Sequence, residues 1–413
     1  MYVTFIQQIV HLTISRFKTP ASLEMSESYM PQEAQDRVDY PGDPHVARPS
    51  TIPDALKTCA ISHLSLLTPS QKLPLESIYI DQDDGERIEE FIKLLSEHSY
   101  LGPSVKRVSL SVLENATLAS SLLKILPNIR VLELFFPHAH GWLGADYILR
   151  MSVTDIFMSG KLTTLHINNL HVSTKSFLAI IPTSVTSISF SNVLIDGSPP
   201  GEYLPRPDAR IQDLTIIKSP DITSLLGHCH NNPWLPLDLL HLDSFHFYPD
   251  DFDQEGDVWH ILICCASSIR TLRWELGSTG KYNPYGHVNI GTLTRLKDLY
   301  ITIEAEELPT LHHLLGTITK KSVLENIELK VICTAEEDSF VTEYGDRLEW
   351  KDLDDVVDSQ SASLRRFSLE FVLGFYIEGV VEKFIESVKG SFLQLHDLDS
   401  AAVECRIFYT VLQ

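Results

Sequence analysis

Apolar and polar residues follow a recurring pattern along most of this 413-residue chain. One apolar residue is followed by two residues that are mostly polar, and then by two apolar residues with a single position between them. Leu162, Leu165 and Ile167 are one example, with Thr163 and Thr164 as the polar pair. Because side chains of a β-strand point alternately to its two faces, the pattern predicts strands that are buried on one face.

The spacing of the pattern, and not any single match, indicates a repeat. Three fixed apolar positions match by chance about 4% of the time, so roughly 15 chance matches are expected in a chain of this length. Successive matches lie about 29 residues apart on average, at the long end of the range for leucine-rich repeats. The first apolar positions are Leu75, Val105, Ile129, Leu162, Val185, Ile211, Leu237, Ile269, Leu296, Leu324 and Leu364.

Segments with helical periodicity lie between the predicted strands. Residues 86–99 place four apolar side chains on one face of a helix: Ile88, Phe91, Ile92 and Leu95. Shorter segments of this kind lie at 173–181, 221–229, 257–265 and 308–318. The Asn that often closes such repeats appears at Asn169 and Asn192, in each case one place early. Each unit leaves an apolar face that only its neighbours can cover.

We therefore expect an α/β fold: a curved, leucine-rich-repeat-like solenoid of about 11 strand–loop–helix units, with a parallel concave sheet and helices on the convex side. One apolar residue of each strand should join a single buried row, which includes Leu132, Leu165, Ile188, Leu214, Leu272 and Leu299. The expected strands lie near 76–81, 107–111, 131–135, 164–168, 187–191, 213–217, 239–243, 271–275, 298–303, 326–331 and 366–371.

The same alternation selects the side chains that point to the concave face. They are the residue between the two buried positions of each strand and the residue after them. Arginine and tyrosine are common among residues that dominate protein–protein binding energies. The candidates for binding a partner are Phe135, His166, Arg273, Glu275, Tyr300 and Glu328. The alternative is that these side chains are merely solvated and that loops or the convex face bind.

The N-terminal region resembles a known family. The stretch "DALKTCAISHLSLLTPSQKLPLESIYID" (54–81) resembles the second half of an F-box and its join to the first repeat in fungal F-box proteins with leucine-rich-repeat-like C-terminal regions. Leu66 stands where the family usually has Trp. The matching residues are Ala55, Leu56, Lys57, Cys59, Ile61, Pro69, Ser70, Gln71, Lys72 and Ile78. Segments 293–303, 322–331, 350–371 and 392–405 resemble later parts of the same proteins.

Three regions follow from this resemblance. Residues 1–53 are expected to be poorly ordered, because 15–53 are polar and rich in proline. Residues 5–12 are a candidate remnant of the first F-box helix. The resemblance implies an F-box-like helical segment at 54–74 and the solenoid at 75–413. An intact F-box, a degenerate or split one, and no F-box at all are the alternatives that the sequence leaves open.

The resemblance implies a protein–protein interaction module and not an enzyme. The chain would be the substrate-recognition subunit of an SCF-type cullin–RING ubiquitin ligase. It would dock on a Skp-type adaptor through Leu56, Cys59, Ile61 and Leu67. The alternative is a stand-alone leucine-rich-repeat scaffold that has lost adaptor docking. The identity of the bound protein substrate does not follow from the sequence.

The net charge of −22 argues against a general affinity for nucleic acids or anionic membranes, because both would be repelled. The sequence contains no apolar run of about 18 residues, so we expect no membrane span. The N-terminus lacks the basic start of a signal peptide, and the 6 cysteines form no disulfide framework. A cytoplasmic or nuclear protein with reduced thiols is expected.

The sequence gives little support for a metal site. His228, Cys229 and His230 lie one repeat away from Cys264 and Cys265, and no C-x-x-C motif joins them. Both later cysteines end an apolar helical segment, where packing in the core explains them. We therefore expect neither a metal nor a cofactor. The acidic run 250–257 is most simply a solvated loop, and the alternative for it is contact with a basic partner.

Overall fold

One large parallel β-sheet organises the described part of the computed structural model. The residues described are 76–80, 85–111, 116–173, 181–196, 209–227, 237–249, 255–275, 289–319, 322–333, 349–360, 363–373, 379–392 and 404–411. Within them, consecutive strands pair with each other in parallel, in the order of the chain. The strands are β1 (Ser77–Ile80), β2 (Arg107–Ser111), β3 (Val131–Gly141), β4 (Thr164–Ser173), β5 (Ser187–Ser191), β8 (Asp213–Ile217), β10 (Ser244–Tyr248), β11 (Thr271–Glu275), β12 (Asp298–Glu304), β13 (Asn326–Cys333), β14 (Arg366–Leu373) and β15 (Glu404–Val411).

Three shorter strands accompany this sheet. β6 (Leu194–Asp196) pairs with the end of β4, and β7 (Ala209–Arg210) pairs with β9 (Leu237–Asp238) in a separate small sheet. Single 3₁₀ turns occur at Gly102–Ser104, Trp142–Gly144, Ile290–Thr292 and Ala305–Glu307.

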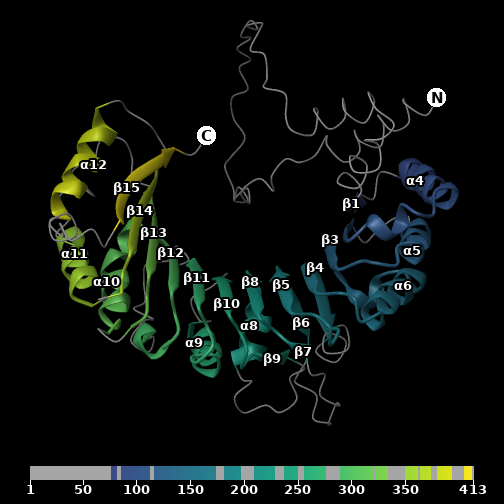
Figure 1. Ribbon diagram of the computed structural model, residues 1–413, viewed down its shortest axis with the longest axis horizontal. Helices are drawn as coiled ribbons and strands as arrows, with labels where there is room; N and C mark the ends of the chain where they lie inside the picture. Colours follow the sequence, from purple (N-terminus) through teal and green to yellow (C-terminus); the bar gives the residue numbers. More distant parts are fainter. Residues whose placement is uncertain are drawn as a thin grey trace, which may run out of the picture.

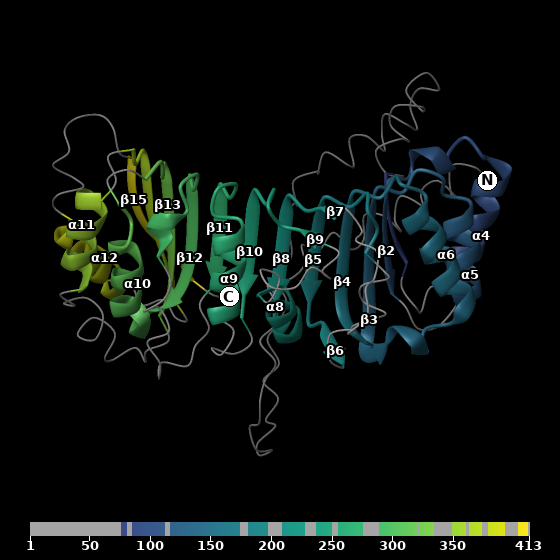
Figure 2. The ribbon, with the colours of Figure 1, turned by 90° about the horizontal axis from the view of Figure 1, so that it is seen from below.

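The helices lie on one side of the sheet. They form the outer layer in Figure 1, and Figure 2 shows the same layers from another direction. α4 has the predicted stripe, and its Ile88, Phe91 and Leu95 are buried in the common core. We call the other side of the sheet the open face. The helices are α4 (Gly85–Glu97), α5 (Ala116–Lys124), α6 (Tyr147–Met158), α8 (Pro220–Gly227), α9 (Glu255–Cys264), α10 (Leu308–Gly316), α11 (Glu349–Gln360) and α12 (Val380–Ser391).

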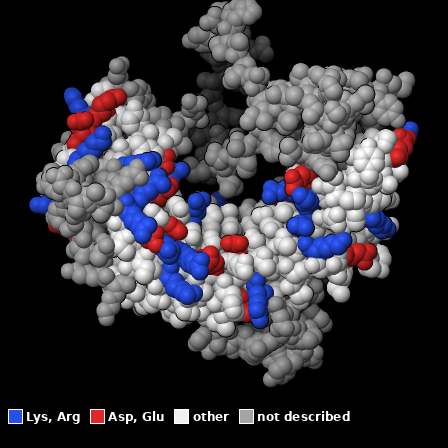
Figure 3. Space-filling model, in the orientation of Figure 1, with Lys and Arg blue, Asp and Glu red and all other residues white. Residues whose placement is uncertain are grey.

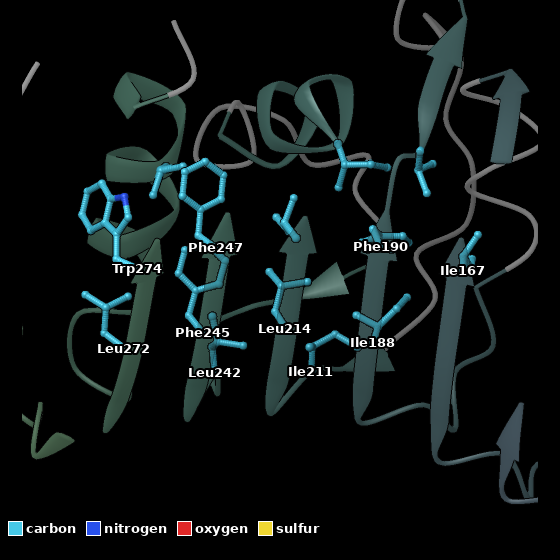
Figure 4. Close-up of a cluster of buried hydrophobic side chains, with 14 of the residues drawn as sticks. Ile167, Ile188, Phe190, Ile211, Leu214, Leu242, Phe245, Phe247, Leu272 and Trp274 are labelled. Carbon is cyan, nitrogen blue, oxygen red and sulfur yellow. The ribbon is translucent and has the colours of Figure 1, made fainter. Parts of the chain in front are cut away.

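The core fills the layer between strands and helices. The predicted buried row is confirmed: Leu132 pairs in register with Leu165, Ile188 and Leu214, and Leu272 pairs with Leu299. Each of these side chains is at most 1% exposed. Phe245 continues the row between Leu214 and Leu272. Figure 4 shows this part of the core, where Phe247 and Trp274 also lie against the helical layer.

The predicted strand at 239–243 is wrong. The strand of this unit is β10, five residues later, and Leu240 is exposed. The stretch contains two overlapping matches to the pattern, Leu237–Leu240–Leu242 and Leu242–Phe245–Phe247, and the sheet uses the second. The second match lets Phe245 and Phe247 pack in the core, which buries more apolar surface than the first.

The other predicted strands lie within a few residues of the observed ones, although several continue farther than expected. β15 was not predicted. The poorly ordered region expected at 1–53 and the F-box-like segment expected at 54–74 lie outside the described residues. None of the described helices is long and apolar enough to cross a membrane.

Three equivalent positions, one within β4 and one directly after each of β5 and β8, have left-handed backbone. They are Asn169 (φ 56°), Asn192 (φ 53°) and Lys218 (φ 45°), which follow residues that pair in register across the sheet. The side-chain amide of Asn192 donates a hydrogen bond to Oδ1 of Asn169 at 3.0 Å. Asparagine tolerates this conformation better than other residues with a side chain, so it suits a turn repeated in neighbouring units.

Replacing Asn192 by Ala should therefore lower the free energy of unfolding by about 2 kcal/mol. This figure combines the cost of left-handed backbone with the loss of one hydrogen bond, and chemical denaturation measures it. Lys218→Ala is the matched control, because neither residue favours left-handed backbone, and it should change stability much less. Equal effects of the two changes would contradict the importance of asparagine at this turn.

Candidate functional site

The open face displays two rows of side chains that cross the sheet. In the central strands these residues are half-buried or exposed, while the residues between them are buried. The first row contains Ser109, Glu133, His166, Ser189, Thr215, His246, Arg273, Tyr300, Glu328, Ser368 and Arg406. The second contains Ser111, Phe135, Asn168, Ser191, Ile217, Tyr248, Glu275, Thr302, Lys330, Glu370 and Phe408.

The six predicted partner-binding residues all lie in these rows, and none of them is buried. The structure does not bring them into one group. Phe135 and His166 lie on β3 and β4, whereas the other four lie on β11, β12 and β13. Three strands separate the two groups, so β4 and β11 are about 19 Å apart across the sheet.

Arg273 and Tyr300 contact each other on adjacent strands. The guanidinium carbon of Arg273 lies 5.0 Å from the centre of the Tyr300 ring, a cation–π contact. Arg273 is exposed and Tyr300 is half-buried, so the ring supports the guanidinium from one side. Stacking leaves the N–H groups at the edge of the guanidinium free to bind a carboxylate or a carbonyl oxygen of a partner.

Two further contacts extend this group toward the middle of the sheet. Nε2 of His246 lies 3.0 Å from Oε1 of Glu275, and both side chains are partly exposed. Nζ of Lys218 lies 5.5 Å from the centre of the Tyr248 ring. We call the resulting surface over β8, β10, β11 and β12 the central cluster; it consists of Lys218, His246, Tyr248, Arg273, Glu275 and Tyr300.

No family model matches this chain, and no curated protein matches it. The geometry of the open face is therefore the basis for assigning a function.

Sequence reasoning missed half of the central cluster. His246 and Tyr248 were overlooked because the strand was expected at 239–243, where neither residue belongs. The signal was present, since Leu242, Phe245 and Phe247 also fit the pattern. Lys218 lies just past the end of β8, where alternation along the strand no longer says which way a side chain points.

The polar side chains around His166, on β3 and β4, are bound mainly to each other and to the neighbouring strand. Glu133 accepts hydrogen bonds from Ser109 at 3.0 Å and from Asn168 at 3.4 Å. Burial lowers the pKa of His166, and the nearby positive charge of Arg107 adds to this, while Glu133 acts in the opposite direction. Burial therefore favours the neutral imidazole of His166. Because Glu133 already accepts two hydrogen bonds within the sheet, this group has less to offer a partner than the central cluster.

Cys264, Cys265 and Cys333 are at least partly buried in the fold. Cys265 is fully buried, as expected, and Cys264 is half-buried. Burial raises the pKa of the Cys265 thiol to about 12, and Cys264 adds to the effect, so Cys265 is a poor nucleophile and metal ligand. Among the residues described, no three His, Cys, Asp or Glu side chains are grouped to hold a metal ion. His228, Cys229 and His230 lie outside the described residues.

The four residues predicted to dock on an adaptor, Leu56, Cys59, Ile61 and Leu67, also lie outside the described residues. Their role rests on the sequence resemblance.

Proposed function

We propose that this chain is a protein–protein recognition module that binds a protein partner on its open face. The observation that carries the proposal is the central cluster, in which aromatic and charged side chains are displayed on neighbouring strands of one sheet. Arginine and tyrosine are enriched among residues that dominate binding energies. A parallel sheet holds them at fixed spacing, which lowers the entropic cost of binding.

We further propose that the sheet and helices are a leucine-rich-repeat-like solenoid, with the open face as its concave side. Strand pairing in chain order, helices on one side and the paired Asn169 and Asn192 all support this. In Figure 1 the strand–helix units follow an arc with the helices outside, which also favours a solenoid.

The resemblance of residues 54–81 supports a more specific role. The chain would be the substrate-recognition subunit of an SCF-type ubiquitin ligase in the cytoplasm or nucleus. A Skp-type adaptor would bind Leu56, Cys59, Ile61 and Leu67. This role requires no catalytic residue and no cofactor in the chain itself, because ubiquitin transfer would take place on other subunits. A stand-alone scaffold that binds only through its open face is the alternative.

Replacing Arg273 and Tyr300 together by Ala should remove partner binding and leave the fold intact. Wild type and variant would be compared by affinity capture and mass spectrometry. The free energy of unfolding should fall by about 1 to 2 kcal/mol, because the cation–π contact and the packing of a half-buried ring are lost while the core stays intact. The matched control is Lys93→Ala with Tyr147→Ala, which removes exposed side chains of the same kinds from the helical layer.

Proteins lost with the double variant and retained with the control would be partners of the open face. Unchanged recovery with a folded variant would contradict the proposal.

The same capture experiment separates the ligase subunit from the stand-alone scaffold. The wild type would capture a Skp-type adaptor if the chain is a ligase subunit. The double variant Leu56→Asp with Leu67→Asp should then fail to capture it. Its absence from every sample would favour the scaffold.

A further inference from the structure

Helix α6 is apolar on both of its sides. The residues buried on its inner side are Leu149, Ser152, Val153, Ile156 and Phe157. Four large apolar side chains are exposed on its outer side: Tyr147, Ile148, Met151 and Met158. Elsewhere in the described helices, the only exposed large apolar side chain is Ile263 of α9. A helix at the surface of a soluble protein normally has a polar outer side, so this apolar face indicates a docking surface.

The exposed residues of α6 follow the spacing of a coiled-coil seam. Tyr147, Met151, Thr154 and Met158 are all exposed and follow one another at intervals of four, three and four residues. This is the alternation of the a and d positions of a heptad, which places the four side chains in one row along the helix. The 12 residues of α6 give this row a length of about 18 Å.

Both ends of α6 are fixed by the local structure. The side chain of Asp146 accepts hydrogen bonds from the backbone N–H groups of Ile148 at 2.7 Å and Leu149 at 3.4 Å. Just past the other end, Gly160 has left-handed backbone (φ 68°), which is typical of a helix terminus. The row of exposed side chains is therefore held in place before any partner binds, which lowers the entropic cost of association.

The two charged residues of α6 lie on opposite flanks of this row. Arg150 directly precedes Met151, and Asp155 directly follows Thr154, so they occupy the g and e positions of the heptad. Neither of them forms an ion pair within the described part of the chain. The guanidinium carbon of Arg150 lies 5.9 Å from the centre of the Tyr147 ring. Each charge is therefore available to a partner.

Few charged side chains surround this part of the helical layer. In Figure 3, which has the orientation of Figure 1, coloured side chains are sparser on the side of α4, α5 and α6 than on the side of α10, α11 and α12. A second copy of the chain, which carries the same net charge of −22, would therefore meet the least repulsion on the side of α6.

We propose that the outer face of α6 is a homodimer interface, in which the α6 helices of two copies pair in parallel. In a parallel pair, the g residue of one helix faces the e residue five positions later in the other. Arg150 of each copy would therefore face Asp155 of the other copy, and the two-fold symmetry would form this ion pair twice. An antiparallel pair would instead place like charges on the same flank. The charges thus favour a second copy in the parallel orientation.

The proposed interface is small. Its apolar side chains offer a few hundred Å² for each copy, compared with about 800 Å² for each partner of a standard interface. We therefore expect a reversible dimer with a dissociation constant of about 10 µM. Because α6 lies in the helical layer, on the far side of the sheet from the open face, dimerisation would leave both open faces accessible (Figure 1).

Sedimentation velocity of the full-length chain, from about 1 to about 100 µM, measures this association. Met151→Lys with Met158→Lys should raise the dissociation constant about tenfold or more, because like charges of the two copies would meet in the seam. Lysine is a good helix former, so α6 should remain folded, and denaturation curves check this. The matched control is Leu240→Lys with Ile263→Lys, which changes the net charge equally at other exposed apolar positions and should leave association unaltered.

Exchange of the flanking charges tests the parallel orientation. Arg150→Glu and Asp155→Arg should each weaken association about tenfold, because both symmetric pairs become repulsive. An equimolar mixture of these two variants should recover the wild-type association. In the mixed dimer, the two exchanged residues attract each other on one flank and the two unchanged residues attract each other on the other.

Loss of association in the lysine variant alone, together with recovery in the mixture, supports the proposal. A wild type that stays monomeric at about 100 µM would overturn it and leave the face of α6 to a helix of another protein. Association that survives in the lysine variant would place the dimer contact elsewhere and also overturn it. A mixture that fails to recover would overturn the parallel pairing. Arg273 and Tyr300 are unchanged in all these proteins, so each result is independent of the proposed function of the open face.

Discussion

Replacing Leu272 by Asp should unfold the middle of the sheet. Leu272 is fully buried in the row that also contains Phe245 and Leu299. An unpaired carboxylate at this position costs several kcal/mol, and the lost packing of a leucine adds about 2 to 5 kcal/mol. Hydrogen exchange followed by mass spectrometry should show loss of protection in β10, β11 and β12.

Arg273→Asp is the matched control for this change. It places the same residue one position farther along β11, on the open face, where water can solvate the carboxylate. Protection in the three strands should remain close to that of the wild type. Because each unit contacts mainly its neighbours, protection in β2 and β3 should survive even in Leu272→Asp. Uniform loss of protection along the whole chain would contradict this local response.

The second large effect concerns the pH dependence of stability through Glu307. Its side chain is buried before α10, and its Oε2 has no hydrogen-bond partner. Burial raises the pKa of this carboxyl to about 7, with smaller contributions from Glu304 and Glu306. In the unfolded chain a glutamate titrates near pH 4.3. The folded state therefore holds the proton more tightly than the unfolded state does.

The sign follows from linkage between proton binding and folding. The favourable contribution of protonated Glu307 is fully present below about pH 4.3 and is lost as the pH rises through about 7. Glu307→Gln replaces the carboxyl group by a carboxamide, which is neutral at every pH. The change should raise the free energy of unfolding at pH 8 by about 3 kcal/mol and have little effect at pH 4. Denaturation curves at the two pH values measure this. Glu386→Gln, at an exposed position of α12, should show no such difference.

The buried row was predictable because it depends on two local signals. Alternation within each strand identifies Leu132, Leu165 and Leu299 as facing one side, and the spacing of the repeats places them at equivalent positions. β15 escaped the same reasoning because Ala402 and Cys405 stand where larger apolar residues begin the pattern in other units. Small residues carry too weak an apolar signal to mark a strand.

The open face could be predicted residue by residue but not as a site. Alternation selected Arg273 and Tyr300, yet their contact depends on the register between β11 and β12, which is fixed by packing of distant residues. The position of β10 also depends on packing between strands, because Phe245 must align with Leu214 and Leu272. A single sequence does not reveal which of two overlapping matches gives that alignment.

The strict order of the strands also determines how the sheet would respond to mechanical force. Each strand of the main sheet is hydrogen-bonded to the next main strand of the chain, and no later strand returns to close it within the described residues. Tension along the chain would therefore load the terminal strand first and separate its hydrogen bonds from its neighbour one unit at a time. Such a sheet would lengthen in small successive steps and behave as an extensible spring, in contrast to a fold whose terminal strands lie in its centre.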